Sequence, residues 1–415
     1  MALPLLGTGG GGAGWQKAGV LEALLDAALV VAKAGIDVVL VVNSSAAYAA
    51  AQRLRARRLR SFWPERSTAE LAKAQRLAGL ARAGKLVPFI GAGASRAAGL
   101  PGWSDLLKEI AVAVGYESVA DQNELAALDP RDAALVLQRR AGGRLDDMLR
   151  ARFSPDLPSS LTHALLASLP VSEAATTNYD RLFEQAWAAA GSSSVKVLPR
   201  EDTSTAERWL LKLHGDVDDD KKPLVLTREQ YLGFAQTGGA IAGVLQAMLL
   251  TRHLLIVGYG LSDETFHRIA HDVREVRATP IAAGIAASTT GPKLGTALLV
   301  TQLGMAEGIW SDDLDLVSFH ADDDVDASVR RQARFLDLVG LLAAPIEAYV
   351  LGEGFAGLSA DGADRELRRL LESLRAHVPE LDSEMRRAVQ EVLSRFGDTA
   401  PQETTMRPGA RSRHL

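Results

Sequence analysis

The chain of 415 residues is 47 % hydrophobic and 23 % charged, the composition of a globular protein long enough for two or three domains. Its net charge of −5 gives no overall basic excess of the kind that binds nucleic acid, and the lack of cysteine excludes disulfides and cysteine-ligated zinc. Since it has neither a signal-peptide pattern nor the run of about 20 apolar residues that a bilayer requires, we expect a cytoplasmic protein without a membrane partner.

The N-terminal segment predicts a small α/β unit over residues 1–62. Apolar runs at 3–7 and 36–43 are typical of buried strands, and the glycine loop "GTGGGGAG" follows the first of them. Two helices with apolar spacing are predicted at 16–34 and 45–60. Residues 1–60 weakly resemble the second half of a macro-type fold, in which such a turn holds ADP-ribose and the chain would begin in mid-domain. The alternative is an α/β appendage with a glycine turn.

Residues 53–66, "RLRARRLRSFWPER", carry six arginines. A solvated helix end that leads into a linker has this composition. An acidic partner or nucleic acid is the alternative, so direct nucleic-acid binding stays open. A helix over 67–84 is predicted next.

From residue 86 onward, apolar runs alternate with helical patterns, which predicts a doubly wound, Rossmann-like, mostly parallel α/β sheet. The candidate strands are 86–90, 172–177, 209–213, 254–258, 297–301 and 314–319. The span 104–165 has mostly helical patterns and predicts a helical lobe beside the sheet. Helices close the chain at 326–344, 363–377 and 383–396, and Gly397 is a plausible cap of the last.

These patterns divide the chain into four parts. The small α/β unit at 1–62 is followed by a ligand-binding α/β domain at 78–345. Helices over 346–397 come next, and residues 398–415 are predicted to be a disordered tail because they show no hydrophobic periodicity.

The stretch "LVPFIGAGASRAAGLPGW", residues 86–103, places a glycine loop directly after a buried strand. Glycines permit a tight turn and let a ligand approach the backbone closely. A helix that begins after the loop directs free N–H groups, and the positive end of its dipole, towards an anion such as pyrophosphate. The spacing Gly91-x-Gly93-x-Ser95 differs from the GxGxxG of dehydrogenases, and on its own this signal is weak.

Further polar or glycine-containing clusters follow other predicted strands. They are "TTNYDRLFE" (176–184), "KLHGD" (212–216), "LTREQY" (226–231) and "VGYGLSDETF" (257–266). Because the carboxyl ends of parallel strands line one crevice, we expect these segments to share a ligand site with the first glycine loop.

Taken together, these motifs resemble the sirtuin-like family, the silent-information-regulator type of NAD-binding domain, over about residues 78–320. The order GAGxS, T-x-N-x-D, H-G and G-x-G matches, with Thr176, Asn178 and Asp180 in the second motif. Protein-deacylating sirtuins have a four-cysteine zinc module and a "GIPDFR" loop, whereas this chain has no cysteine and reads "GLPGWS". "TTNYDRLFE", "GLPGW" and "GYGLSD" are similar instead to the NAD-hydrolysing sirtuin-like effectors of bacterial anti-phage defence.

The resemblance implies two catalytic residues, Asn178 and His214. An imidazole can accept a proton from a ribose hydroxyl or from water near neutral pH, so His214 would be a general base. An amide can orient water or the ribose without changing charge. The alternatives are a buried core histidine at 214 and a strand-end Asx-turn at 178.

The resemblance also implies cofactor contacts. They fall at Gly91, Ala92, Gly93 and Ser95 for the pyrophosphate and proximal ribose, at Thr177 and Asp180 past the second strand, and at Gly258, Tyr259, Gly260 and Asp263 for the adenosine end. Asp180 would contact the nicotinamide side or brace its loop. Asp263 would accept from ribose hydroxyls or cap the helix that starts near Glu264. The acidic clusters at 216–222 and 311–326 lack calcium-loop spacing, so we interpret both as solvated loops and expect no metal, zinc included.

The implied activity is hydrolysis of NAD+ to nicotinamide and ADP-ribose, in a regulated effector that depletes NAD+ during anti-phage defence. Such an effector is expected to be controlled by homo-oligomerisation and by a protein partner, either a DNA-translocase-type ATPase or a phage-derived trigger. Two alternatives stay open: an NAD-dependent protein deacylase, and a non-catalytic regulatory subunit that binds NAD+ or ADP-ribose.

Overall fold

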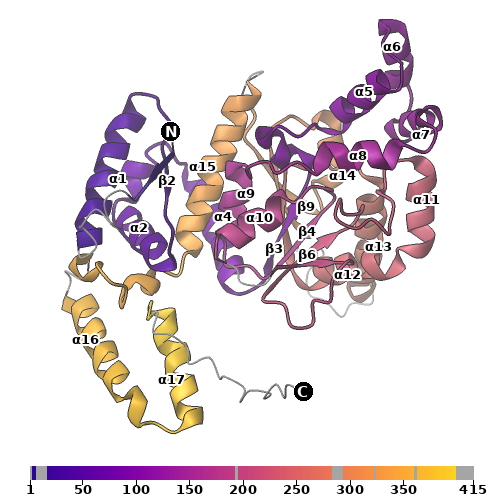
Figure 1. The fold of residues 1–415 in the computed structure, drawn as a ribbon. Helices are drawn as coiled ribbons and strands as arrows, with labels where there is room; N and C mark the ends of the chain where they lie inside the picture. The colour runs from indigo at the N-terminus through magenta and orange to yellow at the C-terminus, as the bar shows by residue number, and fades with distance from the viewer. Residues whose placement is uncertain are drawn as a thin grey trace, which may run out of the picture. The chain divides into compact units, whose positions relative to one another are not determined.

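The computed structural model describes residues 2–5, 16–191, 195–282, 293–321, 324–358 and 362–398. The chain divides into two compact units. The larger comprises residues 67–343, and the smaller combines the flanking segments 1–66 and 344–415 (Figure 1).

Within its described residues, the larger unit is built on a seven-stranded sheet in which each pair of neighbours is parallel. The strands are β3 (Leu86–Ile90), β4 (Glu173–Thr176), β5 (Val195–Leu198), β6 (Arg208–Lys212), β7 (His253–Val257), β8 (Gly295–Leu299) and β9 (Leu314–Ser318). This sheet confirms the predicted Rossmann-like α/β fold. The sequence missed β5, because the four residues "VKVL" are too few to show a period.

Helices cover both faces of this sheet (Figure 1). On one face lie α4 (Thr68–Arg82), α9 (Leu161–Ala167), α10 (Leu182–Ala189) and α15 (Val325–Ala343), and on the other α12 (Gly239–Thr251) and α13 (Glu264–Ala282). Shorter elements complete the unit: the 3₁₀ helices η2 (Ala92–Ala98) and η3 (Gly304–Ala306), and the helices α11 (Arg228–Thr237) and α14 (Glu307–Trp310). Phe89 and Ile256 of adjacent strands share a core cluster with Leu245 of α12 and Phe266 of α13.

The segment between β3 and β4 forms the predicted helical lobe. Its helices are α5 (Trp103–Ala113), α6 (Val119–Ala127), α7 (Pro130–Ala141) and α8 (Leu145–Phe153). Leu106, Leu137 and Leu149 pack in one cluster with Tyr179 and Leu224, which follow β4 and β6. The lobe therefore lies against the loops that leave the carboxyl ends of those two strands.

In the strand order β5-β6-β4-β3-β7-β8-β9, the connections that leave the neighbours β3 and β7 run in opposite directions, and this reversal marks one point of the sheet. From β3 the chain adds β4 and then β5 on one side and inserts β6 between them, whereas from β7, on the other side of β3, it adds β8 and β9. In open α/β sheets, ligands bind outside the carboxyl ends of the strands at such a reversal. The loops that follow β3 and β7 are the two glycine loops of the sequence.

The smaller unit contains a parallel pair of short strands, β1 (Ala2–Pro4) and β2 (Val39–Val41). Its other elements are α1 (Lys17–Lys33), α2 (Ser45–Arg57), α3 (Leu59–Phe62), η4 (Ile346–Tyr349), η5 (Ala356–Leu358), α16 (Gly362–His377), η6 (Val378–Glu380) and α17 (Ser383–Arg395). Leu21 and Leu54 share a core with Tyr349, Phe355 and Leu393. Both ends of the described chain thus build one core, a relation that local periodicity cannot reveal.

The predicted four-part division stays a prediction, as does the resemblance of residues 1–60 to a macro-type half. The glycine loop at 7–14 lies outside the described residues, and so does the tail from residue 399 onward. Gly397 follows α17 with a φ of 90°, the left-handed conformation expected of a cap.

No single described helix combines the length and apolarity needed to cross a membrane. One bent pair, Arg228–Phe234 with Gly239–Thr251, meets that requirement only when its two parts, 74° apart in direction, are taken together.

Candidate active site

The two glycine loops lie against each other at the reversal point of the sheet. The N–H of Gly91 donates to the carbonyl of Val257 at 2.9 Å, and the N–H of Gly93 to that of Gly258 at 2.8 Å. A Cβ on Gly91 would lie 2.5 Å from the Gly258 oxygen, and one on Gly258, whose φ is +68°, would lie 2.3 Å from the Ala94 nitrogen. The contact between the loops therefore requires glycine on both of them.

This contact bears on the predicted pyrophosphate site. The N–H groups of Gly91, Gly93 and Ala94 already donate to backbone carbonyls, the last to Gly91 at 3.0 Å. Gly93 is exposed and Ala92 half-buried, so this part of the loop can be reached from solvent. The contact between the two loops already explains the need for glycine there. A pyrophosphate contact at Gly91, Ala92 and Gly93 stays a prediction.

Ser95 lies at the centre of a buried network. Its Oγ donates to Oδ2 of Asp180 at 2.9 Å and accepts from Nδ2 of Asn178 at 3.2 Å. Nε2 of His163 lies 3.5 Å from the same oxygen. In this conformation the Ser95 hydroxyl forms hydrogen bonds within the chain, to Asp180 and Asn178. Its contact with a pyrophosphate stays a prediction.

The amide of Asn178 is held in one orientation. Its Nδ2 donates to the carbonyl of Gly91 and to the hydroxyl of Ser95, each at 3.2 Å, which occupies both amide hydrogens. Its backbone N–H donates to Oγ1 of Thr176 at 3.0 Å. Its Oδ1 is buried and accepts no hydrogen bond from the described residues. Because an unpaired buried acceptor costs about 1–3 kcal/mol, this oxygen is suited to a ligand hydroxyl or a water.

Asp180 uses both carboxylate oxygens within the protein. Oδ2 accepts from Ser95, and Oδ1 accepts from the N–H of Leu182 at 3.0 Å, at the start of α10. These contacts favour the bracing role over the nicotinamide contact, which stays a prediction. Thr177, half-buried beside Asn178, donates its N–H to the carbonyl of Ile90 at 3.4 Å.

His163 of α9 is a neighbour of the site that the sequence analysis missed. Its Nδ1 accepts from the N–H of Ser160 at 3.2 Å, so we assign the proton of the neutral ring to Nε2, which faces Ser95. Burial lowers the pKa of His163, against the opposing effect of Asp180. No local pattern links it to Ser95, 68 positions away.

His214 follows β6 and is 2 % exposed. Its Nδ1 lies 3.5 Å from the hydroxyl of Tyr231, and its Nε2 lies 3.6 Å from Oδ2 of Asp263. Burial lowers the pKa of His214, and the Asp263 carboxylate offsets only part of that shift. The ring is therefore neutral near pH 7, the state that a general base requires.

Asp263 does more than cap its helix. Its Oδ1 accepts from the N–H of Phe266 at 3.1 Å, at the start of α13, as the capping alternative predicted. Its Oδ2 accepts from the Tyr231 hydroxyl at 2.9 Å and faces His214. Contact of this carboxylate with an adenosine ribose stays a prediction.

Tyr259 packs within the protein. Its ring meets Phe89 edge-on with centroids 4.9 Å apart, and burial, with Asp263 and Tyr231 adding, raises the pKa of its hydroxyl well above the ordinary value. Gly260 beside it is exposed. Adenosine contacts of Gly258, Tyr259 and Gly260 stay predictions.

Strand register brings the two predicted catalytic residues to the same edge of the sheet. The last residues of β4 and β6 pair with each other, and Asn178 and His214 each lie two positions beyond that pair. Val225 connects the two loops, because its carbonyl accepts from the hydroxyl of Tyr179 and its N–H donates to the carbonyl of His214, each at 2.7 Å. Their side chains nevertheless belong to separate hydrogen-bonded groups.

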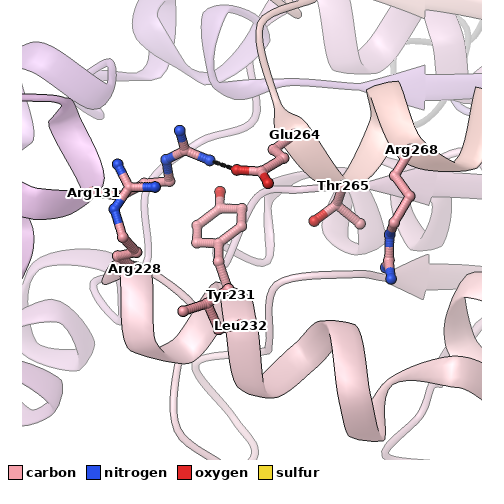
Figure 2. A pocket seen from close by; sticks show the side chains of 7 residues that line it. All are labelled: Arg131, Arg228, Tyr231, Leu232, Glu264, Thr265 and Arg268. Atoms are coloured by element: carbon pink, nitrogen blue, oxygen red, sulfur yellow. Dashed lines mark hydrogen bonds and ion pairs between the residues drawn. The ribbon is translucent and has the colours of Figure 1, made fainter.

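Helix α11 covers His214. The rings of Tyr231 and Phe234 meet the imidazole edge-on, with centroids 5.1 Å and 6.4 Å away. A cavity of about 60 Å³ lies beside Tyr231 (Figure 2), lined by Arg131, Arg228, Tyr231, Leu232, Glu264, Thr265 and Arg268. Arg131 and Glu264 form an ion pair there. The cavity has room for a few water molecules only.

The acidic cluster at 216–222 differs from the expectation at its first two residues, Asp216 and Val217, which are both buried. Asp216 is 2 % exposed, so the interpretation as a solvated loop is wrong there. It pairs with Lys212 and with Arg200. Over the described ranges, no group of three or more histidine, aspartate or glutamate side chains is arranged to hold a metal ion.

Comparison with known proteins gives a family match for part of the larger unit. Residues 172–297 match the family described as the SIR2-like domain. The match includes the segments 176–184, 212–216 and 257–266. The first glycine loop lies outside it.

Three curated relatives match a similar share of the chain. The NAD(+) hydrolase ThsA of Enterococcus faecium is 32 % identical over 200 residues, which are 46 % of this chain and 41 % of the relative. Defense-associated sirtuin 2 of Bacillus subtilis is 28 % identical over 200 residues, 47 % of this chain and 20 % of the relative. The NAD(+) hydrolase ThsA of Cytobacillus dafuensis is 27 % identical over 190 residues, 45 % and 37 %. The chain thus spans at most about two fifths of the length of these relatives.

Proposed function

Because the chain contains a SIR2-like domain, we propose that it hydrolyses NAD+ to nicotinamide and ADP-ribose. Two relatives that match this chain over 200 and 190 residues, at 32 % and 27 % identity, are named NAD(+) hydrolases, which supports the assignment. One observation carries the proposal. Asn178, whose amide is held in one orientation, and His214, whose imidazole is neutral, both lie just past the matched ends of β4 and β6.

The chemistry follows from the bond to be broken. Nicotinamide leaves the ribose as a neutral molecule, and positive charge develops on the sugar in an oxocarbenium-like transition state. Water adds its oxygen to the anomeric carbon, and the proton that it loses passes to His214 and then to solvent. The free Oδ1 of Asn178 accepts a hydrogen bond from that water or from a ribose hydroxyl, which fixes the geometry of attack.

The remaining contacts of the dinucleotide are parts of the same proposal. The pyrophosphate lies over the accessible part of the first glycine loop, at Ala92 and Gly93, and the adenosine lies along the second, at Gly258 to Gly260, with its ribose towards Asp263. Thr177 and Asp180 line the nicotinamide end. The meeting of both loops at the reversal point of the sheet supports this placement.

We further propose that the activity is regulated and serves cytoplasmic anti-phage defence by NAD+ depletion. The name of the Bacillus subtilis relative, a defense-associated sirtuin, supports the role. Helix α11 packs over His214, next to a cavity of about 60 Å³. This packing supports a resting state in which NAD+ has restricted access to His214. Homo-oligomerisation and a protein partner, either a DNA-translocase-type ATPase or a phage-derived trigger, are the proposed means of opening it.

Incubation of the purified chain with NAD+, alone and with the products of neighbouring genes, tests the activity. Nicotinamide and ADP-ribose are expected in equal amounts, without any acylated peptide. Nicotinamide released only when an acyl-lysine peptide is present would indicate a deacylase. NAD+ left intact in every mixture, with ADP-ribose binding retained, would indicate a regulatory subunit.

A further inference from the structure

Lys212, the last residue of β6, is 1 % exposed. An ammonium group is costly to bury unless it is paired and hydrogen-bonded, so a lysine at this position of a core strand requires a reason. It stands two positions before His214.

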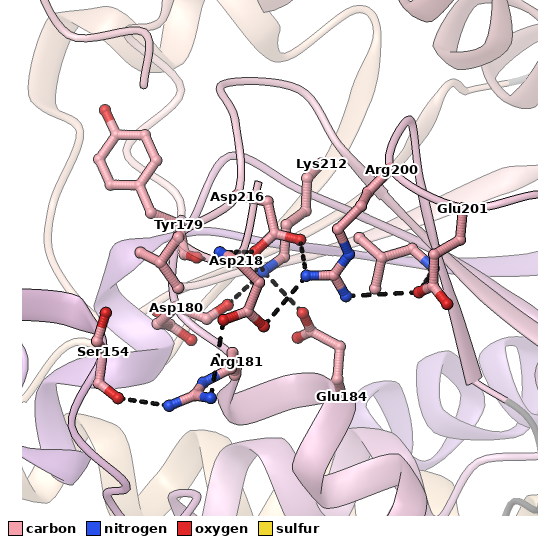
Figure 3. A network of polar contacts seen from close by, with 12 residues as sticks. Ser154, Tyr179, Asp180, Arg181, Glu184, Arg200, Glu201, Lys212, Asp216 and Asp218 are labelled. Atoms are coloured by element: carbon pink, nitrogen blue, oxygen red, sulfur yellow. Dashed lines mark hydrogen bonds and ion pairs between the residues drawn. The ribbon is translucent and has the colours of Figure 1, made fainter. Parts of the chain in front are cut away.

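The Nζ of Lys212 is surrounded by oxygens from other segments (Figure 3). It donates to the carbonyls of Tyr179 at 3.2 Å and Asp180 at 2.6 Å, and it pairs with Oε1 of Glu184 at 2.7 Å and Oδ1 of Asp216 at 3.1 Å. Burial alone would lower the pKa of Lys212, but the two carboxylates raise it, so the group remains an ammonium ion.

These contacts join the two loops that carry the proposed catalytic pair. Tyr179 and Asp180 directly follow Asn178, and Asp216 comes two positions after His214. Arg200 holds the other oxygen of Asp216, Oδ2, at 2.9 Å. We refer to Lys212, Glu184, Asp216 and Arg200 as the Lys212 cluster.

We propose that Lys212 is a positioning residue of the site, one that holds the loop of Asn178 and the loop of His214 in a fixed relation through a single buried ammonium group. The proposal rests on the NAD+ hydrolase function proposed above. An apolar side chain of similar length would fill the same space, but it would leave two carbonyls without this donor and would supply no charge to Glu184 and Asp216.

The double variant Lys212→Met with Glu184→Gln tests the proposal while keeping the net charge of the cluster, since Asp216 retains Arg200. We expect kcat for nicotinamide release to fall about 100-fold, the effect of a displacement near 1 Å, with KM within about twofold of wild type. Amide hydrogen exchange should become faster at 177–181 and 213–217 but not in the rest of the sheet. A folded double variant with wild-type kcat and exchange would overturn the proposal.

Lys85→Met is the matched control. Lys85 directly precedes β3 and is exposed, so its loss should leave kcat and exchange unchanged. A similar fall in kcat in this variant would mean that any lysine beside the sheet has the effect, which would contradict a specific role of Lys212.

Asp216→Asn is the second variant, for the case in which the double variant does not fold. It weakens the ion pairs of Asp216 with Lys212 and Arg200 but leaves Glu184 and the two carbonyls in contact with Lys212. A smaller fall in kcat and faster exchange confined to 213–217 are therefore expected, and wild-type values of both would overturn the proposal. The exchange experiment does not depend on turnover. If the wild-type chain released no nicotinamide in any mixture, the proposed function would fail, and exchange would still decide the role of Lys212.

Discussion

Two buried polar groups lie at the same edge of the sheet, and they differ in how they are paired. In the Lys212 cluster each carboxylate faces a cation, at 2.7 to 3.1 Å. At the proposed catalytic pair, Nε2 of His214 and Oδ1 of Asn178 are buried and make no hydrogen bond within the described part of the chain. Since Oε2 of Glu184 and Oδ2 of Asp216 also lack a hydrogen bond, the two groups differ in charge pairing and not in hydrogen bonding. Ion pairs hold the backbone together in the cluster, and a neutral imidazole and a neutral amide stand where a substrate would bind.

Replacement of His214 by alanine should have the largest effect on activity. Loss of a general base lowers kcat by about 10² to 10⁴-fold, while the Lys212 cluster still holds the loops. Nicotinamide release measures the loss, and a thermal melt checks the fold. His271→Ala, an exposed histidine of α13, is the matched control and should keep wild-type kcat. Turnover that survives in His214→Ala would remove this residue from the mechanism.

Asn178→Asp tests the oriented amide. A carboxylate oxygen would replace the Nδ2 that now donates to the carbonyl of Gly91 and to Ser95, and it would add a negative charge near Asp180. We expect kcat to fall by about 100-fold or more, comparable to the loss of one fixed donor in an active site. Asn123→Asp, an exposed position on α6, should change nothing. An active Asn178→Asp variant would show that the amide orientation is irrelevant.

Gly91→Ala should disturb the region of the proposed catalytic pair and leave the Lys212 cluster intact. The new Cβ would lie 2.5 Å from the Gly258 oxygen, so the two glycine loops must separate. We expect a loss of about 1–3 kcal/mol in the free energy of unfolding, together with weaker NAD+ binding. Gly79→Ala on α4, where a Cβ meets nothing within 4 Å, should instead stabilise by about 0.5–1 kcal/mol. Equal effects of both substitutions in urea denaturation would contradict the loop contact.

A pH dependence of stability separates two buried histidines, His253 and His214. Burial, with Arg76 adding, lowers the pKa of His253 on β7 to about 4, from 6.5. The unfolded chain binds that proton more readily, so the free energy of unfolding should fall as pH drops from 6.5 towards 4, by up to about 1.4 kcal/mol per pH unit. In His253→Gln this slope should decrease, as urea denaturation at several pH values would show.

In His253→Gln, the pH dependence of kcat should not change in the way that the pH dependence of stability does. It should still fall at acid pH, because His214 acts as a base only when it is neutral and its pKa is lowered on folding. An activity profile that moved with His253→Gln would assign the titration to the wrong histidine.

The sequence predicted most of the larger unit because buried parallel strands are continuous apolar runs. Six of its described strands lie within two residues of the expected bounds, and only β5 was missed. Asn178 and His214 could be named through the resemblance, since their motifs are local. His163 could not, because its partner Ser95 is 68 positions away. Lys212 did leave a signal, a charged residue inside the buried run "WLLKL", and such a residue is almost never fully buried without a partner.

The shared core of the smaller unit has a consequence for biosynthesis. Leu21 of α1 and Leu54 of α2 pack with Tyr349 and Leu393. These two helices are therefore synthesised before all of residues 67–343 and stay without these packing partners until the later residues have been made. At about 5–20 residues per second, the wait lasts roughly 14 to 55 seconds. Throughout that time the apolar faces of α1 and α2 lack the packing partners that follow residue 343. A chain terminated at residue 343 would leave these faces exposed. Such a truncated product is expected to aggregate or to be degraded, however well its seven-stranded sheet has folded.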